Sequence, residues 1–318
     1  MRSYIMRRLL LLIPTLFLVT LIVFFSVRFV PGSVVDLMTS QLSAAGGEII
    51  EREQLEEILG LDKPVYIQYF NWMGKAVRGD LGESLWQGRG ITADILMKIP
   101  ISLELGFFAI LTGLSISLPI GIYSAIRQDT IGDYIGRSVA ILFIAVPSFW
   151  IGTMVVVFPA SWWNWSPAVQ YYPITENLGA NLVQFIIPSV IMGMVMSGTS
   201  MRMTRTMMLE VLRQDYIRTA WSKGLRERMV VIRHAMRNAL IPVITIVGMQ
   251  IPVLIGGSVI METIFNLPGM GRFMIDALNR RDYPIISGIN LVMATVILCV
   301  NLAVDLTYSV LDPRIRYR

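Results

Sequence analysis

The residue types that usually carry catalysis are scarce in this chain. His234 is its single histidine and Cys299 its single cysteine, which is too little for a disulfide framework or for most Cys–His chemistry. A zinc site needs several sulfur or nitrogen ligands. The sequence also lacks HExxH and the GxxxxGK[ST] loop that cradles nucleotide phosphates. We therefore expect no catalytic residue, cofactor site or metal site, and we expect His234 to lie at a surface or interface.

Three carboxylates lie close to apolar runs, where ionisable residues can mark an ion path. Glu104, Glu262 and Asp305 all fall near the ends of these runs, so an interfacial or solvated carboxylate is the simpler interpretation. A channel or ion-coupled transporter would place such groups deeper and remains an alternative. An intramembrane enzyme is disfavoured because no Ser–His pair can be placed within a bilayer.

The composition indicates an integral membrane protein. The 318 residues are 54% hydrophobic and 15% charged, whereas a soluble domain carries about 25% charged residues. A helix crosses the hydrocarbon core with roughly 20 apolar residues. Pro159 and the Trp-rich residues 161–167 are expected to end the third such run and to begin an interfacial aromatic segment. The six predicted spans are 9–27, 105–126, 138–160, 177–201, 238–261 and 283–304.

The positive charges are sorted by side of the membrane. Of the 27 Lys and Arg residues, 17 fall on one side: three before the first span, two in 127–137, nine in 202–237 and three after Pro313. Cytoplasmic loops carry such an excess, so both termini and the 202–237 loop are predicted to be cytoplasmic. The net charge of +5 follows from this bias and does not indicate nucleic-acid binding.

The first 30 residues have the basic start and apolar run of a secretory signal peptide. The run is longer than a typical signal's apolar region and no A-x-A site closely follows it, so we predict a retained first helix. The predicted segments are a cytoplasmic N-terminus with the first helix (1–30), an external cap (31–100), a membrane core (101–308) that includes a cytoplasmic loop (205–240), and a cytoplasmic tail (309–318).

The external segments are predicted to contain short helices. EREQLEEILGLDKP (51–64) is typical of a short acidic helix ending at Gly60, and VYIQYFNWMGKAV (65–77) has apolar residues at helical spacing. The cap either packs on the membrane domain or serves as a docking surface for an external partner. After the fifth span, Pro268-Gly269 predicts a turn followed by a short helix at the outer surface.

The densest cationic stretch is DYIRTAWSKGLRERMVVIRHAMRNALIP, residues 215–242, with six Lys and Arg residues against two acids. Lys223-Gly224 can end a helix, because glycine adopts the left-handed conformation required there. We predict a helix, a glycine turn and a second helix. The stretch is either an anchor on anionic lipid or a protrusion that docks in a partner's groove. The predicted apolar stripes are Leu209, Leu212, Tyr216 and Ala220, then Met229, Ile232, Met236 and Ala239.

Thr-Ala-x-x-x-Gly at 219–224 resembles the EAA loop of ABC-transporter permeases, the cytoplasmic helix pair that docks in the ATPase subunit. The surrounding YIRTAWSKGL and RHAMRNALIPVIT are similar to the dipeptide/oligopeptide branch, as are MRSYIMRRLLLLIPTL, GDLGESL, ETIFNLPGMGR and LDPRIRYR. The blocks follow one another in the family's order over nearly the whole chain. Arg218 and Thr219 replace the Glu and first Ala of the general loop pattern, as in the peptide branch.

The resemblance implies an all-α membrane protein with six transmembrane helices and the type I ABC importer permease architecture. It implies a bacterial or archaeal plasma (inner) membrane location. It also implies a heterodimer with a second homologous permease, two ATP-binding subunits that hold ATP and Mg²⁺, and an extracytoplasmic substrate-binding protein. The implied cargo is a di- or oligopeptide; nickel, glutathione and oligosaccharides are the alternatives, and an ATP-independent channel or secondary transporter is a more distant one.

Two sets of site residues follow. Glycines within the predicted spans, Gly193 and Gly198 among them, are expected to serve close helix packing, with direct substrate contact as the alternative. Glycine pairs and a polar side chain make 248–257 in the fifth span the candidate pore-lining stretch. The residues expected to dock on the ATPase are Arg213, Asp215, Arg218, Thr219, Ala220, Lys223, Gly224, Leu225 and Arg226. The candidate pore residues are Gly248, Gln250, Pro252, Gly256 and Gly257.

Overall fold

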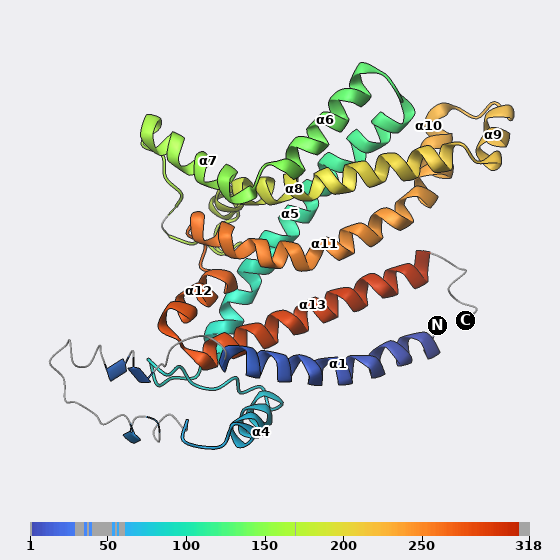
Figure 1. Ribbon diagram of the computed structural model, residues 1–318. Coiled ribbons are helices and arrows are strands. Elements are labelled where there is room, and N and C mark those ends of the chain that lie inside the picture. The colour runs from blue at the N-terminus through green and yellow to red at the C-terminus, as the bar shows by residue number, and fades with distance from the viewer. Residues whose placement is uncertain are drawn as a thin grey trace. The chain divides into compact units, whose positions relative to one another are not determined.

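The computed structural model describes residues 2–28, 61–168 and 170–311, and seven positions between 35 and 56 (35, 36, 38, 39, 53, 54 and 56). Half of the predicted acidic helix 51–64 (residues 51, 52, 55 and 57–60) and all of the tail 312–318 lie outside the described residues. The described chain is nearly all helical (Figure 1). It forms two compact units, one mainly of Ser102–Leu267 with Cys299 onward, the other of Arg2–Ile101 and Pro268–Leu298.

Within the described residues, five helices are long and apolar enough to cross a membrane, and a bent helix pair would make a sixth. This confirms the predicted all-helical membrane architecture. The five apolar segments are Leu10–Val27, Thr92–Ile126, Leu178–Leu212, Glu227–Ile264 and Tyr283–Val304. They belong to α1 (Arg2–Arg28), α5 (Thr92–Ile126), α8 (Leu178–Leu212), α11 (Met236–Ile264, with the two short helices before it) and α13 (Tyr283–Leu311).

The prediction of one helix over 138–160 is wrong. The segment forms α6 (Ile131–Ala145) and α7 (Ser148–Trp163), which meet at 88°. The break falls at Pro147, because proline lacks an N–H and pushes the preceding residue out of the helical region; Val146 is extended, with φ −89° and ψ 122°. Pro159 lies inside α7 and does not end it. The helix ends instead at Asn164, which adopts the left-handed conformation.

In the first unit, α8 packs against α6, α7 and α11, and Figure 1 shows α8 and α11 running alongside each other. Glycines permit close approach here, as expected for helix packing in membranes. A Cβ atom on Gly193 would lie 2.8 Å from the Ala109 carbonyl oxygen, and one on Gly198 would lie 2.7 Å from that of Ala140. The packing role expected of these glycines is therefore confirmed.

The second unit contains α1, α4 (Val65–Ala76), the start of α5, α12 (Met270–Arg280) and the start of α13. Both short helices predicted after residues 64 and 269 are present. Loop 79–91 is fixed to the end of α12 by polar contacts: Ser84 Oγ donates to Asp282 Oδ2 at 2.5 Å and Trp86 Nε1 to the Arg280 carbonyl at 2.7 Å. The core of this unit is Val27, Leu81, Ile91, Ile95, Met270, Ala277, Ile285, Ile286 and Ile289.

Candidate functional site

The cationic stretch forms a helix, a glycine turn and a second helix, as predicted. α8 ends at Leu212 and α9 (Asp215–Ser222) follows. α10 (Glu227–Met229), the π-helix η1 (Val230–Ala235) and α11 then run on without a break. The structure therefore confirms the local fold of the loop, and it changes which residues face inward.

The first predicted apolar stripe is wrong in its central part. It assumed one helix through 209–220, but Gln214 is extended (φ −71°, ψ 148°) and starts a new helix. The break shifts the helical phase by about one residue, so Ile217 is fully buried while Tyr216 is 44% exposed. Ala220 is buried as predicted. α9 is thus held by Ile217 and Ala220.

The second predicted stripe is correct at Ala239, which is buried, and at Met236, which packs against the same cluster, but it is wrong at Met229 and Ile232. Residues 230–235 form a π-helix, in which hydrogen bonds run from i to i+5 and each turn takes more residues than in an α-helix. Val230, Val231 and Ala235 are therefore buried, while Met229 and Ile232 are 45% and 47% exposed. An α-helical spacing could not have identified Val230 and Val231, because the π-helix takes more residues per turn than that spacing assumes.

The turn between the helices is a Schellman motif. Gly224 has φ +73°, its N–H donates to the Trp221 carbonyl at 2.9 Å, and the Leu225 N–H donates to the Ala220 carbonyl at 3.4 Å. No atom lies within 4 Å of the place of a Cβ on Gly224. Glycine is therefore required here by backbone conformation, and space around it is not limiting.

The loop is anchored to the ends of α5 and α8. Met208, Ile217, Val230 and Ala235 form a buried cluster with Ala125 of α5. Polar contacts add to it: Arg213 Nη2 donates to Gln128 Oε1 at 3.4 Å, Arg127 and Glu227 form an ion pair at 3.8 Å, and Asn238 Nδ2 donates to Tyr216 Oη at 2.7 Å. The loop is thus a packed projection, with its own core.

An apolar face remains exposed on this projection. Trp221, Leu225, Met229 and Ile232 are 43%, 37%, 45% and 47% exposed. All of the predicted docking residues are exposed except Ala220, which is buried inside the loop. The sequence analysis did not include Trp221 among the docking residues. It also missed Met229 and Ile232, because it assigned both to the buried side.

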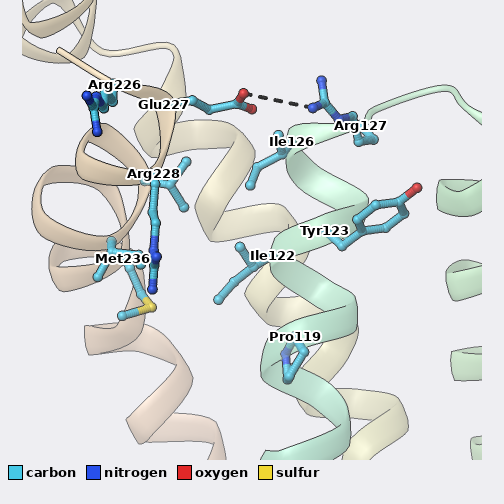
Figure 2. Close-up of a pocket in the computed structure, with 11 residues that line it drawn as sticks. Pro119, Ile122, Tyr123, Ile126, Arg127, Arg226, Glu227, Arg228 and Met236 are labelled. Atoms are coloured by element: carbon cyan, nitrogen blue, oxygen red, sulfur yellow. Dashed lines mark ion pairs between the residues drawn. The ribbon is translucent and has the colours of Figure 1, made fainter.

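A groove of about 800 Å³ opens beside this face (Figure 2). In Figure 2, Ile122 and Ile126 point from α5 into the groove, and the Glu227–Arg127 ion pair closes its upper end. The contribution of α5 had no signal in the sequence, since it depends on the packing of α5 against the loop. The lining residues are Pro119, Ile122, Tyr123, Ile126, Arg127, Arg226, Glu227, Arg228, Val231, Ile232 and Met236.

The candidate pore residues divide into two groups. Gly248 lies in a helix contact, since a Cβ there would lie 2.6 Å from Val304 Cγ1. Gln250 Nε2 donates to Ser200 Oγ at 3.0 Å, which joins α11 to α8. Gly256 and Gly257 have no atom within 4 Å of a Cβ position. Pro252 is half-buried.

Glu262 departs from the interfacial role expected of it. It is fully buried on α11 and accepts a hydrogen bond of 2.6 Å from Ser102 Oγ of α5. The short hydroxyl–carboxyl bond explains how a polar group is accommodated there, because a buried acceptor without a partner is costly. Among the described residues, no three His, Cys, Asp or Glu side chains group as metal ligands.

The comparisons with known proteins agree with this architecture. Residues 117–317 match the family described as "Binding-protein-dependent transport system inner membrane component", and residues 1–102 match its N-terminal family. The chain is 36% identical to the dipeptide transport system permease protein DppB of Escherichia coli (strain K12), and 37% identical to the oligopeptide transport system permease protein AppB of Bacillus subtilis (strain 168). Both alignments cover 100% of each chain.

A solved structure of the MetNI methionine ABC transporter in inward-facing conformations matches the fold. Its TM-score is 0.54 at 14% sequence identity, over 69% of this chain and 96% of that chain. At this identity the match establishes the fold alone. The family assignment instead rests on the two matched regions and on the full-length relatives. This chain belongs to the family of binding-protein-dependent transport system inner membrane components, the permease subunits of ABC importers.

Proposed function

We propose that this permease carries di- or oligopeptides, as one half of a heterodimer with a second permease of the same family. ATP and Mg²⁺ would be held by two separate ATP-binding subunits, and an extracytoplasmic binding protein would deliver the cargo. The observation that carries the coupling role is the packed helix–turn–helix of 213–239 with its exposed apolar face. The peptide cargo is supported by the two full-length relatives named for dipeptide and oligopeptide transport.

The loop has the properties expected of a motor-docking element. Its buried side is fixed to the membrane helices, and Trp221, Leu225, Met229 and Ile232 are 37–47% exposed in the described part of the chain. An amphipathic helix with such a face binds a hydrophobic groove of a partner. The exposed cations around it, including Arg218 and Lys223, would set the orientation by charge complementarity. We propose that the ATP-binding subunit supplies that groove.

The orientation of the chain follows from the distribution of positive charge. The loop and both termini would be cytoplasmic, because Lys and Arg are concentrated on that side. α5, α8 and α11 would bound the transport path. Gly256, which is exposed, and Gly257, which is half-buried, are the candidate positions where α11 meets cargo or the second permease. The segments 1–30, 31–100, 101–308 and 309–318 would then serve as anchor, cap, path and tail.

Reconstitution tests the transport proposal directly. The permease pair, the ATP-binding subunits and the binding protein are placed in vesicles, and uptake of defined di- and tripeptides is measured with and without ATP. ATP-dependent peptide uptake is expected. Uptake of nickel, glutathione or an oligosaccharide in place of peptide would contradict the proposed cargo. Uptake without ATP would contradict coupling and support a channel.

Docking is tested by protection from a thiol reagent. In a Cys299→Ala background, Leu225→Cys is exposed to maleimide in the permease alone and should become protected when the ATP-binding subunits assemble. Ile131→Cys lies on α6, is 80% exposed, and serves as the reference that stays reactive. Equal reactivity of Leu225→Cys before and after assembly would show that the face docks elsewhere.

A further inference from the structure

Helix α4 has three distinct faces. Tyr69 and Trp72 face α1, where their rings lie 5.2 Å and 5.7 Å from the ring of Phe24. Gln68, Asn71, Lys75 and Arg78 form a polar face on an open cavity of about 860 Å³, which Phe70 and Trp72 also border. The third face is apolar and exposed in the described part of the chain: Tyr66, Phe70 and Val77 are 63%, 67% and 75% exposed. At 100° per residue these three positions fall within a narrow stripe.

The contact with α1 fixes the depth of α4. Tyr69 Oη and Thr20 Oγ1 lie 2.9 Å apart and both side chains are buried. Thr20 Oγ1 donates its own hydrogen to the Phe17 carbonyl at 2.7 Å, so the tyrosine hydroxyl is the donor between them. Thr20 lies within the apolar segment Leu10–Val27. It is seven residues from the Val27 end, which at 1.5 Å per residue is a depth of about 10 Å.

Phe24, the other contact of α4, is three residues from Val27 and therefore about 5 Å deep. The Tyr69 side chain thus extends toward the centre of the membrane. The rest of α4 lies at the depth of the last turn of the apolar segment of α1. Interfacial helices lie with their apolar face about 5–10 Å into the boundary between headgroups and acyl chains. Aromatic residues such as Tyr and Trp favour that level, because one end of each is apolar and the other polar.

We propose that α4 is an interfacial helix, lying in the membrane surface at the Val27 end of α1. Tyr66, Phe70 and Val77 insert among phospholipid acyl chains. Lys75 and Arg78, on the polar face, reach the phosphate groups. The segment between the first two spans is therefore partly embedded in the bilayer, and this apolar face is not a platform for a soluble partner. The proposal depends on α1 spanning the membrane and is independent of the transported cargo.

Charge and position favour lipid over a soluble protein as the partner of the apolar face of α4. A water-facing helix at this place would expose three large apolar side chains next to a helix that is itself embedded. The polar face already supplies a boundary with water, on a different side of α4 from the one through which Tyr69 and Trp72 contact α1. Lys75 and Arg78 complement anionic headgroups, whose attraction for a basic residue at the surface adds to apolar insertion.

The test uses nitroxide labels in the assembled transporter. In a Cys299→Ala background, single cysteines replace Tyr66, Phe70, Val77, Asn71 or Lys75, and the labelled complex is reconstituted in phosphatidylethanolamine–phosphatidylglycerol vesicles. Collision rates are measured with oxygen, which concentrates in the bilayer, and with a water-soluble nickel chelate. The oxygen-to-nickel ratio should be several-fold higher at 66, 70 and 77 than at 71 and 75. Equal ratios would place the face in water and overturn the proposal.

A second measurement avoids replacing an aromatic side chain with a labelled cysteine. Photoreactive p-benzoyl-phenylalanine is placed at Phe70, an aromatic-for-aromatic change, with Asn71 as the matched neighbour on the polar face. Irradiation in the same vesicles should give a phospholipid adduct at 70 and none at 71, as seen by mass spectrometry. An adduct at 70 to the second permease or to the binding protein would show that protein covers the face, and would overturn the lipid assignment.

Discussion

Arg205 of α8 holds the carboxylate of Asp133 on α6 with two hydrogen bonds, each 2.7 Å long. Asp133 is fully buried and the Arg205 side chain is 19% exposed. The same carboxylate accepts a hydrogen bond from the Asp129 N–H at 3.1 Å, so it also fixes the turn before α6. This turn directly follows the end of α5, where Arg127 contacts the cationic loop. The pair therefore links helix packing to the base of the docking loop.

Replacing Asp133 with Asn should destabilise the protein by about 3 kcal/mol, because the partly buried Arg205 guanidinium loses the counter-charge of a fully buried carboxylate. The expected result is a lower melting temperature in detergent. Asp129→Asn is the control: Asp129 has φ +60° and is exposed, and asparagine tolerates that conformation. A melting temperature unchanged by Asp133→Asn would mean that the ion pair adds no net stability.

At the glycine turn, conformation should matter more than size. Gly224→Val forces a β-branched residue into the left-handed region, at a cost of about 1–2 kcal/mol, and should uncouple ATP hydrolysis from transport. Gly224→Asn should retain coupling, because asparagine adopts this conformation and the site has free space around it. The measurement is the ratio of peptide uptake to phosphate release in vesicles. Equal ratios for both variants would contradict the role of the turn.

The buried and exposed faces of the loop should respond differently to truncation. Ile217→Ala removes a fully buried side chain and should cost about 2–4 kcal/mol in stability. Ile232→Ala removes a 47% exposed one and should leave the melting temperature unchanged while weakening capture of the ATP-binding subunits. Co-purification and thermal denaturation separate the two effects. The proposed docking face is wrong if Ile232→Ala, together with Met229→Ala, leaves capture intact.

The two ends of the predicted pore stretch provide a matched pair. Gly248→Leu would drive a side chain into Val304 and should destabilise the fold by about 1–3 kcal/mol through overpacking. Gly256→Leu meets no atom within 4 Å, so it should fold normally yet reduce uptake if it faces the path or the second permease. Normal uptake by a folded Gly256→Leu variant would remove this position from the pore.

Removing the Thr20–Tyr69 hydrogen bond should have a small effect that depends on which partner is changed. Tyr69→Phe leaves the Thr20 hydroxyl bonded to its own helix, so about 1 kcal/mol of stability is expected to be lost. Thr20→Val removes the acceptor and leaves the buried tyrosine hydroxyl unpaired, which should cost more, up to about 3 kcal/mol. Thermal denaturation of both variants gives the order. The reverse order would contradict the assigned direction of the bond.

The sequence by itself determined five of the apolar spans and the helix–glycine–helix of the cationic loop. Each of these follows from a local cause. Roughly 20 consecutive apolar residues are enough for a helix to cross the hydrocarbon core, and a glycine permits the left-handed turn at Gly224. The short helices α4 and α12 also follow from local periodicity. The resemblance to the peptide branch of the permeases could be identified without the fold, because several sequence motifs follow one another in the order typical of that branch.

Only the tertiary structure decided which side of each element is buried. The phase break at Gln214 and the π-helix over 230–235 rotate the loop, so Ile217 and Val231 pack inward while Met229 and Ile232 face out. The burial of Glu262 against Ser102 likewise depends on a neighbouring helix. The same apolar residue types occur in contact with lipid, in a contact between helices and on a docking surface, so the sequence does not distinguish these three environments. Only the position of the surrounding helices separates these environments.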